Sequence, residues 1–176
     1  MHQDLETLRD ELERALGGLD DKQTQLRPGG DAARWSIHET VGHLLLTYAA
    51  TEQVMETRIA KGAMTRAQPS ITQRVAQAVV IRAGLFPRGR TAPEMVCPDP
   101  KAAPVPSGIL IERVSVALKN LDMRVAAAEK LFGRQGRSVS HLILGPMSLD
   151  QWRRFHLIHG RHHIKFIARI REEFGV

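Results

Sequence analysis

The sequence predicts an all-α protein, a four-helix bundle with a long crossover between helices two and three. Along four stretches of the chain, apolar residues recur at steps of three and four, which is the spacing of one face of an α-helix. Two of these stretches begin with a capping box, and no stretch shows a convincing strand pattern. The chain has 176 residues, 43% of them hydrophobic, which is enough for one sizeable core. We therefore expect a single domain over residues 1–176.

A stripe of leucines that ends at two glycines predicts the first helix. Glycine commonly follows the last turn of a helix, because it adopts the left-handed conformation without strain. A loop with the sequence Pro-Gly-Gly at 28–30 then leads to the second helix. The leucines are Leu5, Leu8, Leu12 and Leu16, and the glycines are Gly17 and Gly18.

The second helix is expected to begin at the capping box formed by Ser36 and Glu39. Its apolar pattern continues through Met55 towards Gly62. Three consecutive leucines at 44–46 make the helix apolar on more than one side. We therefore expect it to be buried over a wide arc.

Residues 63–107 form the long crossover. The stretch from Pro69 to Leu85 could hold a short helix, with Ser70 as its N-cap. Two proline-containing runs, 86–93 and 96–106, are expected to be extended, because proline cannot continue a helix and disfavours the helical conformation before it. Long loops in a compact domain are often functional or cover another surface.

Two further helices complete the predicted bundle. The third has apolar residues at steps of three and four and ends before Arg134-Gln-Gly-Arg137. A loop leads to the fourth helix, which begins at a second capping box, Ser148 with Gln151. Met147 and Trp152 are placed for a hydrophobic staple across that cap. The apolar positions of the third helix are Ile111, Val114, Leu118, Leu121, Val125, Ala128 and Phe132.

The fourth helix places histidines within its apolar stripe. A helix advances about 100° per residue, so Phe155, His159 and His163 fall close to the face centred on Trp152. Buried imidazoles need partners for both ring nitrogens, and one divalent metal ion can satisfy two rings one turn apart. The alternative is that they are core or cleft histidines bonded to neighbouring groups. Phe166, Ile170 and Phe174 share the apolar face, while Arg153, Arg154, Arg161, Lys165 and Arg171 are expected to point away from it.

His43 on the second helix is the best candidate for a third ligand, because metal sites in bundles are built from facing helices. Three neutral imidazoles suit zinc, nickel or another late first-row divalent ion. They leave coordination positions open for water or substrate, as in a reactive site. Glu39, one turn before His43, could orient its ring, although the capping box explains Glu39 without a metal.

The remaining histidines leave alternatives open. His156 and His159 form a competing pair at i and i+3. His162 could support the metal site or replace His163. His141 could line the cavity. His2 and His38 are expected to be solvated, and Tyr48 is expected in the core.

Two segments together resemble the DinB/YfiT-like superfamily. Trp35-Ser36, Glu39 and His43-Leu44 resemble the opening of that superfamily's second helix. The segment from His141 through Gly145-Pro146-Met147-Ser148 and Trp152 to His159-Gly-Arg-His162-His163 resembles its closing part. The two segments have the expected order and separation.

The resemblance implies a four-helix bundle, often dimeric, that binds a divalent ion such as nickel or zinc through His43, His159 and His163. Members with known chemistry are similar to metal-dependent thiol transferases and isomerases that use a low-molecular-weight bacterial thiol. The middle of this chain carries no catalytic signature of the family, so neither substrate nor reaction is implied.

Composition argues against several other classes. The net charge of +6 is scattered, with a local group at Arg88-Gly-Arg90, so we interpret it as a solvated cationic face and not as a nucleic-acid site. No apolar run is long enough for a membrane span, and the acidic start of the chain does not resemble a targeting peptide. The single cysteine, Cys97, suits a reducing cytoplasm and has no nearby histidine to activate it as a nucleophile.

These observations predict a cytoplasmic, metal-dependent enzyme that acts on a small molecule and forms a homodimer. The resemblance suggests transfer of a low-molecular-weight thiol onto an electrophile, while metal-activated water would give a hydrolase. The alternative is a non-catalytic metal-binding or stress-associated interaction module.

Overall fold

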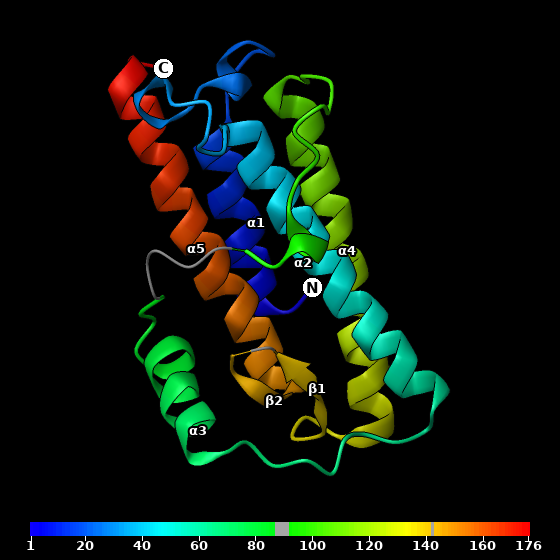
Figure 1. Cartoon of the computed structure of the whole chain (residues 1–176). Helices are drawn as coiled ribbons and strands as arrows, with labels where there is room; N and C mark the ends of the chain where they lie inside the picture. Colours follow the sequence, from blue (N-terminus) through cyan, green and yellow to red (C-terminus); the bar gives the residue numbers. More distant parts are fainter. Residues whose placement is uncertain (87–91, 142) are drawn as a thin grey trace.

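The computed structural model of the chain describes residues 1–86, 92–141 and 143–176 and is mostly helical (Figure 1). Its helices and strands, in chain order, are α1 (Gln3–Leu16), η1 (Gln23–Gln25), η2 (Pro28–Gly30), α2 (Ile37–Ala60), α3 (Ile71–Gln77), η3 (Ala78–Arg82), η4 (Glu94–Val96), α4 (Ser107–Phe132), β1 (Arg137–His141), β2 (Gly145–Ser148) and α5 (Leu149–Phe174). No helix in the described part of the chain is long and apolar enough to cross a membrane.

The four long helices pack side by side around one apolar core (Figure 1). α2 lies against α4, and α1 lies against α5, with further contacts of α1 with α4 and of α2 with α5. The predicted leucine stripe of α1 is confirmed, since all four leucines are completely buried. Gly160 of α5 allows the closest approach to α1, because a Cβ at this position would clash with the buried side chain of Leu8.

The predicted start of α2 is confirmed in detail. The Ser36 hydroxyl accepts from the Glu39 N–H at 3.1 Å, and the Glu39 carboxylate accepts from the Ser36 N–H at 2.8 Å. The predicted wide burial holds only in the first turns, where Ile37 and Val41 are completely buried. It is wrong for Leu46, which is 37% exposed.

The segment between α2 and α4 contains the expected short helix. Ser70 caps α3, as predicted, and the structure adds Gln73 as its partner in a capping box. The helix then continues as the π-helix η3. Between the two proline-containing runs the backbone makes the 3-10 turn η4, which ends at the buried residue Val96, where the second run begins. Most of the first such run, 87–91, lies outside the described residues, and so does the basic group Arg88-Gly-Arg90.

The segment before α5 differs from the predicted loop, since β1 and β2 form an antiparallel pair. Arg137 pairs with Ser148, and His141 pairs with Gly145. The side-chain amide of Gln77 donates to the carbonyls of Leu144 (2.7 Å) and Pro146 (2.9 Å). This long-range support from α3 explains why four- and five-residue strands containing Gly and Pro form without a sequence pattern of their own.

Part of the predicted division of α5 into a buried and an exposed face is wrong. Arg153 is 4% exposed and not solvated, and its guanidinium contacts Glu129 at 2.6 Å and Asp122 and Asp150 at 3.6 Å. The N-terminal half of α5 is covered by α1, α4, η3 and β2, so it is buried on several sides. At the other end, Phe174 is 40% exposed.

Candidate metal centre

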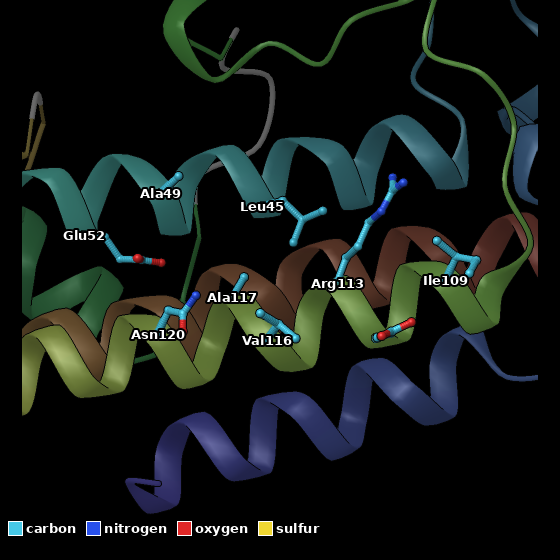
Figure 2. Close-up of a pocket in the computed structure, with 9 residues that line it drawn as sticks. Leu45, Ala49, Glu52, Ile109, Arg113, Val116, Ala117 and Asn120 are labelled. Carbon is cyan, nitrogen blue, oxygen red and sulfur yellow. The ribbon is translucent and has the colours of Figure 1, made fainter.

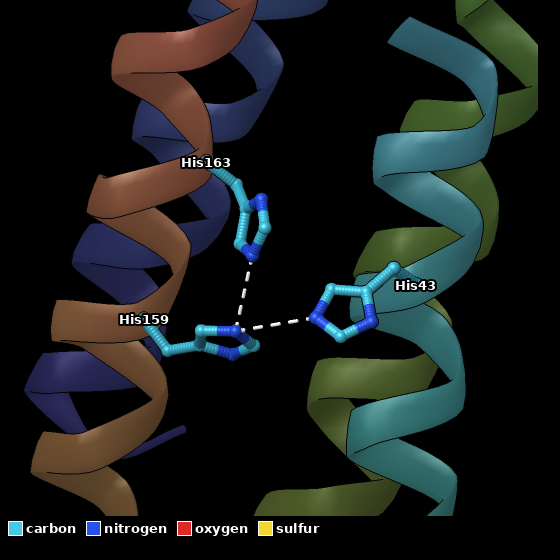
Figure 3. A group of neighbouring side chains, drawn as sticks. All are labelled: His43, His159 and His163. Atoms are coloured by element: carbon cyan, nitrogen blue, oxygen red, sulfur yellow. Dashed lines mark hydrogen bonds between the residues drawn. The ribbon is translucent and has the colours of Figure 1, made fainter. Parts of the chain in front are cut away.

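Three histidine side chains from two helices converge between α2 and α5 (Figure 3). His159 Nε2 lies 3.3 Å from His43 Nε2 and 3.1 Å from His163 Nε2. His159 and His163 are one helical turn apart on α5, which brings their rings to the same face, and His43 reaches them from α2. Each residue offers one ring nitrogen within 4.8 Å of the other two.

The ring of His43 is held by the segment that precedes α4. Its Nδ1 lies 2.8 Å from the backbone carbonyl oxygen of Val96. A carbonyl only accepts hydrogen bonds, so Nδ1 carries the proton and donates, and Nε2 keeps a lone pair. The ring also packs against Trp35, with centroids 4.9 Å apart. This tautomer points a lone pair of His43 at the other two histidines.

The distances from His159 Nε2 to the other two Nε2 atoms fit a shared cation. His159 Nε2 makes both short contacts, and a single N–H could be directed at only one of its two neighbours. Two nitrogens that each lie about 2.0–2.1 Å from a zinc ion, at a tetrahedral angle, are about 3.3 Å apart. The two separations, 3.3 and 3.1 Å, are close to this value. The donor set of three imidazoles also suits zinc or nickel.

Burial keeps the three rings neutral, which is the form that binds metal. His43 and His159 are each 5% exposed. Burial lowers the pKa of His159 well below its usual range, and the neighbouring histidines lower it further. Burial likewise lowers the pKa of His163 to about 3, and it lowers the pKa of His43 despite the hydrogen bond to Val96. At neutral pH the group therefore carries no positive charge that would oppose a cation.

Aromatic rings surround His159. Phe155 lies nearly parallel to its ring, at 15° and with centroids 5.3 Å apart. Phe86 lies 5.1 Å away at 30° and also contacts the ring of His162 at 5.0 Å. Nδ1 of His159 is buried and has no hydrogen-bond partner among the described residues. The position of this ring is therefore set by packing, in contrast to the hydrogen-bonded ring of His43.

The competing histidines are placed elsewhere. His156 is completely buried and bonds through Nε2 to the Thr51 hydroxyl at 3.1 Å. His141 Nδ1 accepts the backbone N–H groups of Ile143 and Leu144, each at 3.2 Å, so it belongs to the hairpin. His162 packs on Phe86 beside His163. Among the described residues, the histidines that lie close enough together to hold one metal ion are His43, His159 and His163, the same three that the sequence singled out.

Other residues that the sequence singled out contribute to the fold and are not part of the histidine group. The Glu39 carboxylate, besides its capping bond, pairs with Arg27 at 2.6 Å, so the acceptor that orients His43 is Val96 and not Glu39. The contact between Val96 and His43 could not be predicted from a local sequence pattern, because 53 residues separate the two. His38 was expected to be solvated but is 7% exposed, because it lies among the buried first turns of α2. Tyr48 is completely buried, as expected.

Cys97 and the N-terminal histidine are not members of the histidine group. Cys97 is exposed, and its thiol points to the carbonyls of Ala92 and Pro93. His2 is half-buried and caps α1, because its Nδ1 accepts from the N–H of Asp4 at 3.3 Å. Neither contact includes a group that would activate the side chain for catalysis.

A surface groove of about 440 Å³ between α2 and α4 is separate from the histidine group (Figure 2). It has an apolar floor that includes Leu45 and Val116, with charged side chains at its edges. It contains no pair of groups arranged for nucleophilic or metal chemistry. The residues that line it are Leu45, Ala49, Glu52, Ile109, Glu112, Arg113, Val116, Ala117 and Asn120.

Comparison with known families matches this combination of helices and histidines to one superfamily. The match to the DinB superfamily covers residues 4–167, which includes α2, α4, most of α1 and α5, and the three histidines. Comparisons with curated proteins and with solved structures find no match. The chain therefore belongs to the DinB superfamily.

Proposed function

We propose that this DinB-superfamily protein binds a divalent metal ion, zinc or nickel, through Nε2 of His43, His159 and His163. The convergence of the three Nε2 atoms carries this proposal, since two of the separations are those expected around one tetrahedral ion. In this interpretation the four long helices form a four-helix bundle, and residues 63–107 are the crossover between its second and third helices.

The proposed activity is transfer of a low-molecular-weight thiol onto an electrophilic small molecule. When bound, the ion would supply the positive charge that deprotonates a coordinating thiol, or water in a hydrolase. In such a transfer the thiol proton would pass to solvent, the sulfur would form a bond to the electrophilic carbon, and the bond to the leaving group would break with its electron pair departing on that group. The resemblance to thiol transferases supports sulfur over oxygen as the nucleophile.

The chain's own residues would orient and isolate this reaction. Val96 keeps the Nε2 lone pair of His43 directed at the site. Phe86 and Phe155 pack against the ring of His159 and exclude water from that side. Low polarity around the site strengthens every electrostatic interaction within it.

We further propose that the protein is a cytoplasmic homodimer. The exposed single thiol of Cys97 suits a reducing compartment. The superfamily resemblance supports the dimer. Light scattering of the purified protein tests the assembly, with a mass near twice 19.6 kDa expected. A mass near 19.6 kDa at micromolar concentration would contradict it.

The second candidate is a non-catalytic metal-binding or stress-associated interaction module. The observation that favours it is burial, because His43 and His159 expose only 5% of their surface each to an incoming substrate. The two functions are distinguished by mixing the protein with a monothiol and an alkylating electrophile, with and without zinc or nickel. Metal-dependent acceleration that is lost in His159→Ala supports the transferase. Equal rates would leave the binding module as the function.

A further inference from the structure

We propose that residues 92–98, which contain η4 and are called here the η4 segment, position His43 for metal binding. The inference rests on the proposed metal function and adds a group outside the histidines. The carbonyl oxygen of Val96 would fix both the tautomer and the direction of the His43 ring. His43 would then be a good ligand only while the η4 segment is packed on α2.

Hydrogen bonds within the η4 segment hold its backbone in a turn, and this turn sets the direction of the Val96 carbonyl. The N–H groups of Val96 and Cys97 donate to the carbonyls of Pro93 and Glu94, each at 3.0 Å. The side chain of Val96 is 8% exposed, so the turn is anchored by one buried apolar residue. The Val96 carbonyl, which takes no part in these two bonds, accepts from His43 Nδ1 at 2.8 Å.

A glycine next to His43 gives the η4 segment room to approach α2. An added Cβ at Gly42 would lie 3.3 Å from Cβ of Pro98, closer than side chains normally pack. Gly42 is therefore the point at which the segment meets the helix, one residue before the histidine that it holds. Glycine inside a helix costs about 1 kcal/mol of stability relative to alanine. The close approach of the segment therefore comes with a small loss of helix stability at Gly42.

The metal and the η4 segment should stabilise each other. Removing an outer hydrogen-bond partner of a metal-binding histidine typically costs 10- to 100-fold in metal affinity. Coupling of this kind is reciprocal, so metal must oppose release of the segment by the same factor. The segment is far from His43 in sequence, and its buried residue Val96 does not belong to the core cluster of the long helices, so its release need not unfold them.

The first test measures zinc affinity of the untagged protein by competition with a chromophoric chelator. Gly42→Val should displace the η4 segment and weaken zinc binding tenfold or more, while the Tm of the metal-free protein stays near that of the wild type. Val96→Ala should weaken zinc binding in the same direction by loosening the segment from its own side. The matched control is Gly108→Val, since a Cβ at Gly108 meets nothing within 4 Å.

The second test uses hydrogen exchange at the backbone N–H groups of Val96 and Cys97, which detects rare release of the segment. Zinc should slow their exchange tenfold or more in the wild type, and a merely structural segment would show no such response. The effect should be absent in His159→Ala, which keeps Cys97 and excludes zinc binding at the thiol as its cause.

The outcomes separate this inference from the proposed function. A wild-type protein that binds no zinc or nickel contradicts both. A wild-type protein that binds zinc, together with a Gly42→Val variant of unchanged affinity, contradicts only the role of the η4 segment. Hydrogen exchange at Val96 and Cys97 whose rate does not change when zinc is added also contradicts the role of the η4 segment.

Discussion

At the residue scale, His43, His159 and His163 differ in how their rings are held. A hydrogen bond from Nδ1 to Val96 fixes His43, and stacking on Phe155 fixes His159. The spacing of His159 and His163 could be predicted to bring them together, because it is a property of a single helix. The tautomer of His43 could not, because its acceptor comes from a different segment and depends on the tertiary fold.

His156 shows what a buried histidine outside the metal group does to stability. Thr51 donates its hydroxyl proton to the Thr47 carbonyl at 3.1 Å, so it accepts from His156 Nε2. Nδ1 of His156 is buried without a partner among the described residues. Burial, reinforced by His141, lowers the pKa of His156 to about 3, so this ring stays neutral in the folded protein well below neutral pH.

The resulting prediction is a loss of stability in mild acid. Below its ordinary pKa of about 6.5, His156 binds a proton in the unfolded chain but not in the folded one, so stability falls as the pH drops towards 3. Between pH 7 and pH 5 this histidine alone should cost about 2 kcal/mol. Urea unfolding with a chelator present checks this, since His156→Gln should show a shallower decline. Identical pH slopes for the two proteins would contradict the assignment.

At the scale of elements, local patterns and long-range contacts explain different parts of the fold. The leucine stripe of α1 and the capping boxes at Ser36, Ser70 and Ser148 are local, and the structure contains all of them. The β1–β2 pair escapes prediction, because its support comes from Gln77 on another element. The burial of Arg153 escapes it for the same reason, since its acidic partners Asp122 and Glu129 lie on α4.

The α1–α5 contact yields a prediction at this scale. Gly160→Ala adds a Cβ that clashes with Leu8, which is completely buried and has little room to move. We expect a net loss of about 1–2 kcal/mol, an overpacking cost partly offset by the better helix propensity of alanine. Denaturant unfolding measures it, with Gly108→Ala as a control that should not destabilise. Adding Leu8→Ala to Gly160→Ala should cost less than the sum of the single changes. Strict additivity would show that the two residues do not compete for space.

At the scale of the whole molecule, the histidine group joins two pairs of helices. His43 belongs to α2, which packs on α4, and His159 and His163 belong to α5, which packs on α1. A ligand that binds the folded chain and not the unfolded one stabilises the fold by mass action. An ion at this position would therefore cross-link the two pairs.

Metal should accordingly raise the stability of the entire molecule. With free zinc at about 100 times its Kd, the free energy of unfolding should rise by about 2.7 kcal/mol. A thermal unfolding series at increasing zinc concentration checks this, and the Tm should climb steadily once the zinc concentration exceeds the Kd. His163→Ala should show a much smaller rise. An equal rise in that variant would place the bound ion elsewhere on the chain.

The most direct test of the central claim is the metal content of purified untagged protein, measured by elemental mass spectrometry. The wild type should carry close to one zinc, nickel or similar ion per chain, and His43→Ala, His159→Ala and His163→Ala should each lose it. His162→Ala is the matched control and should retain the ion, because His162 packs on Phe86 beside the group. A wild-type protein that carries no such ion and takes up neither zinc nor nickel would contradict the metal centre.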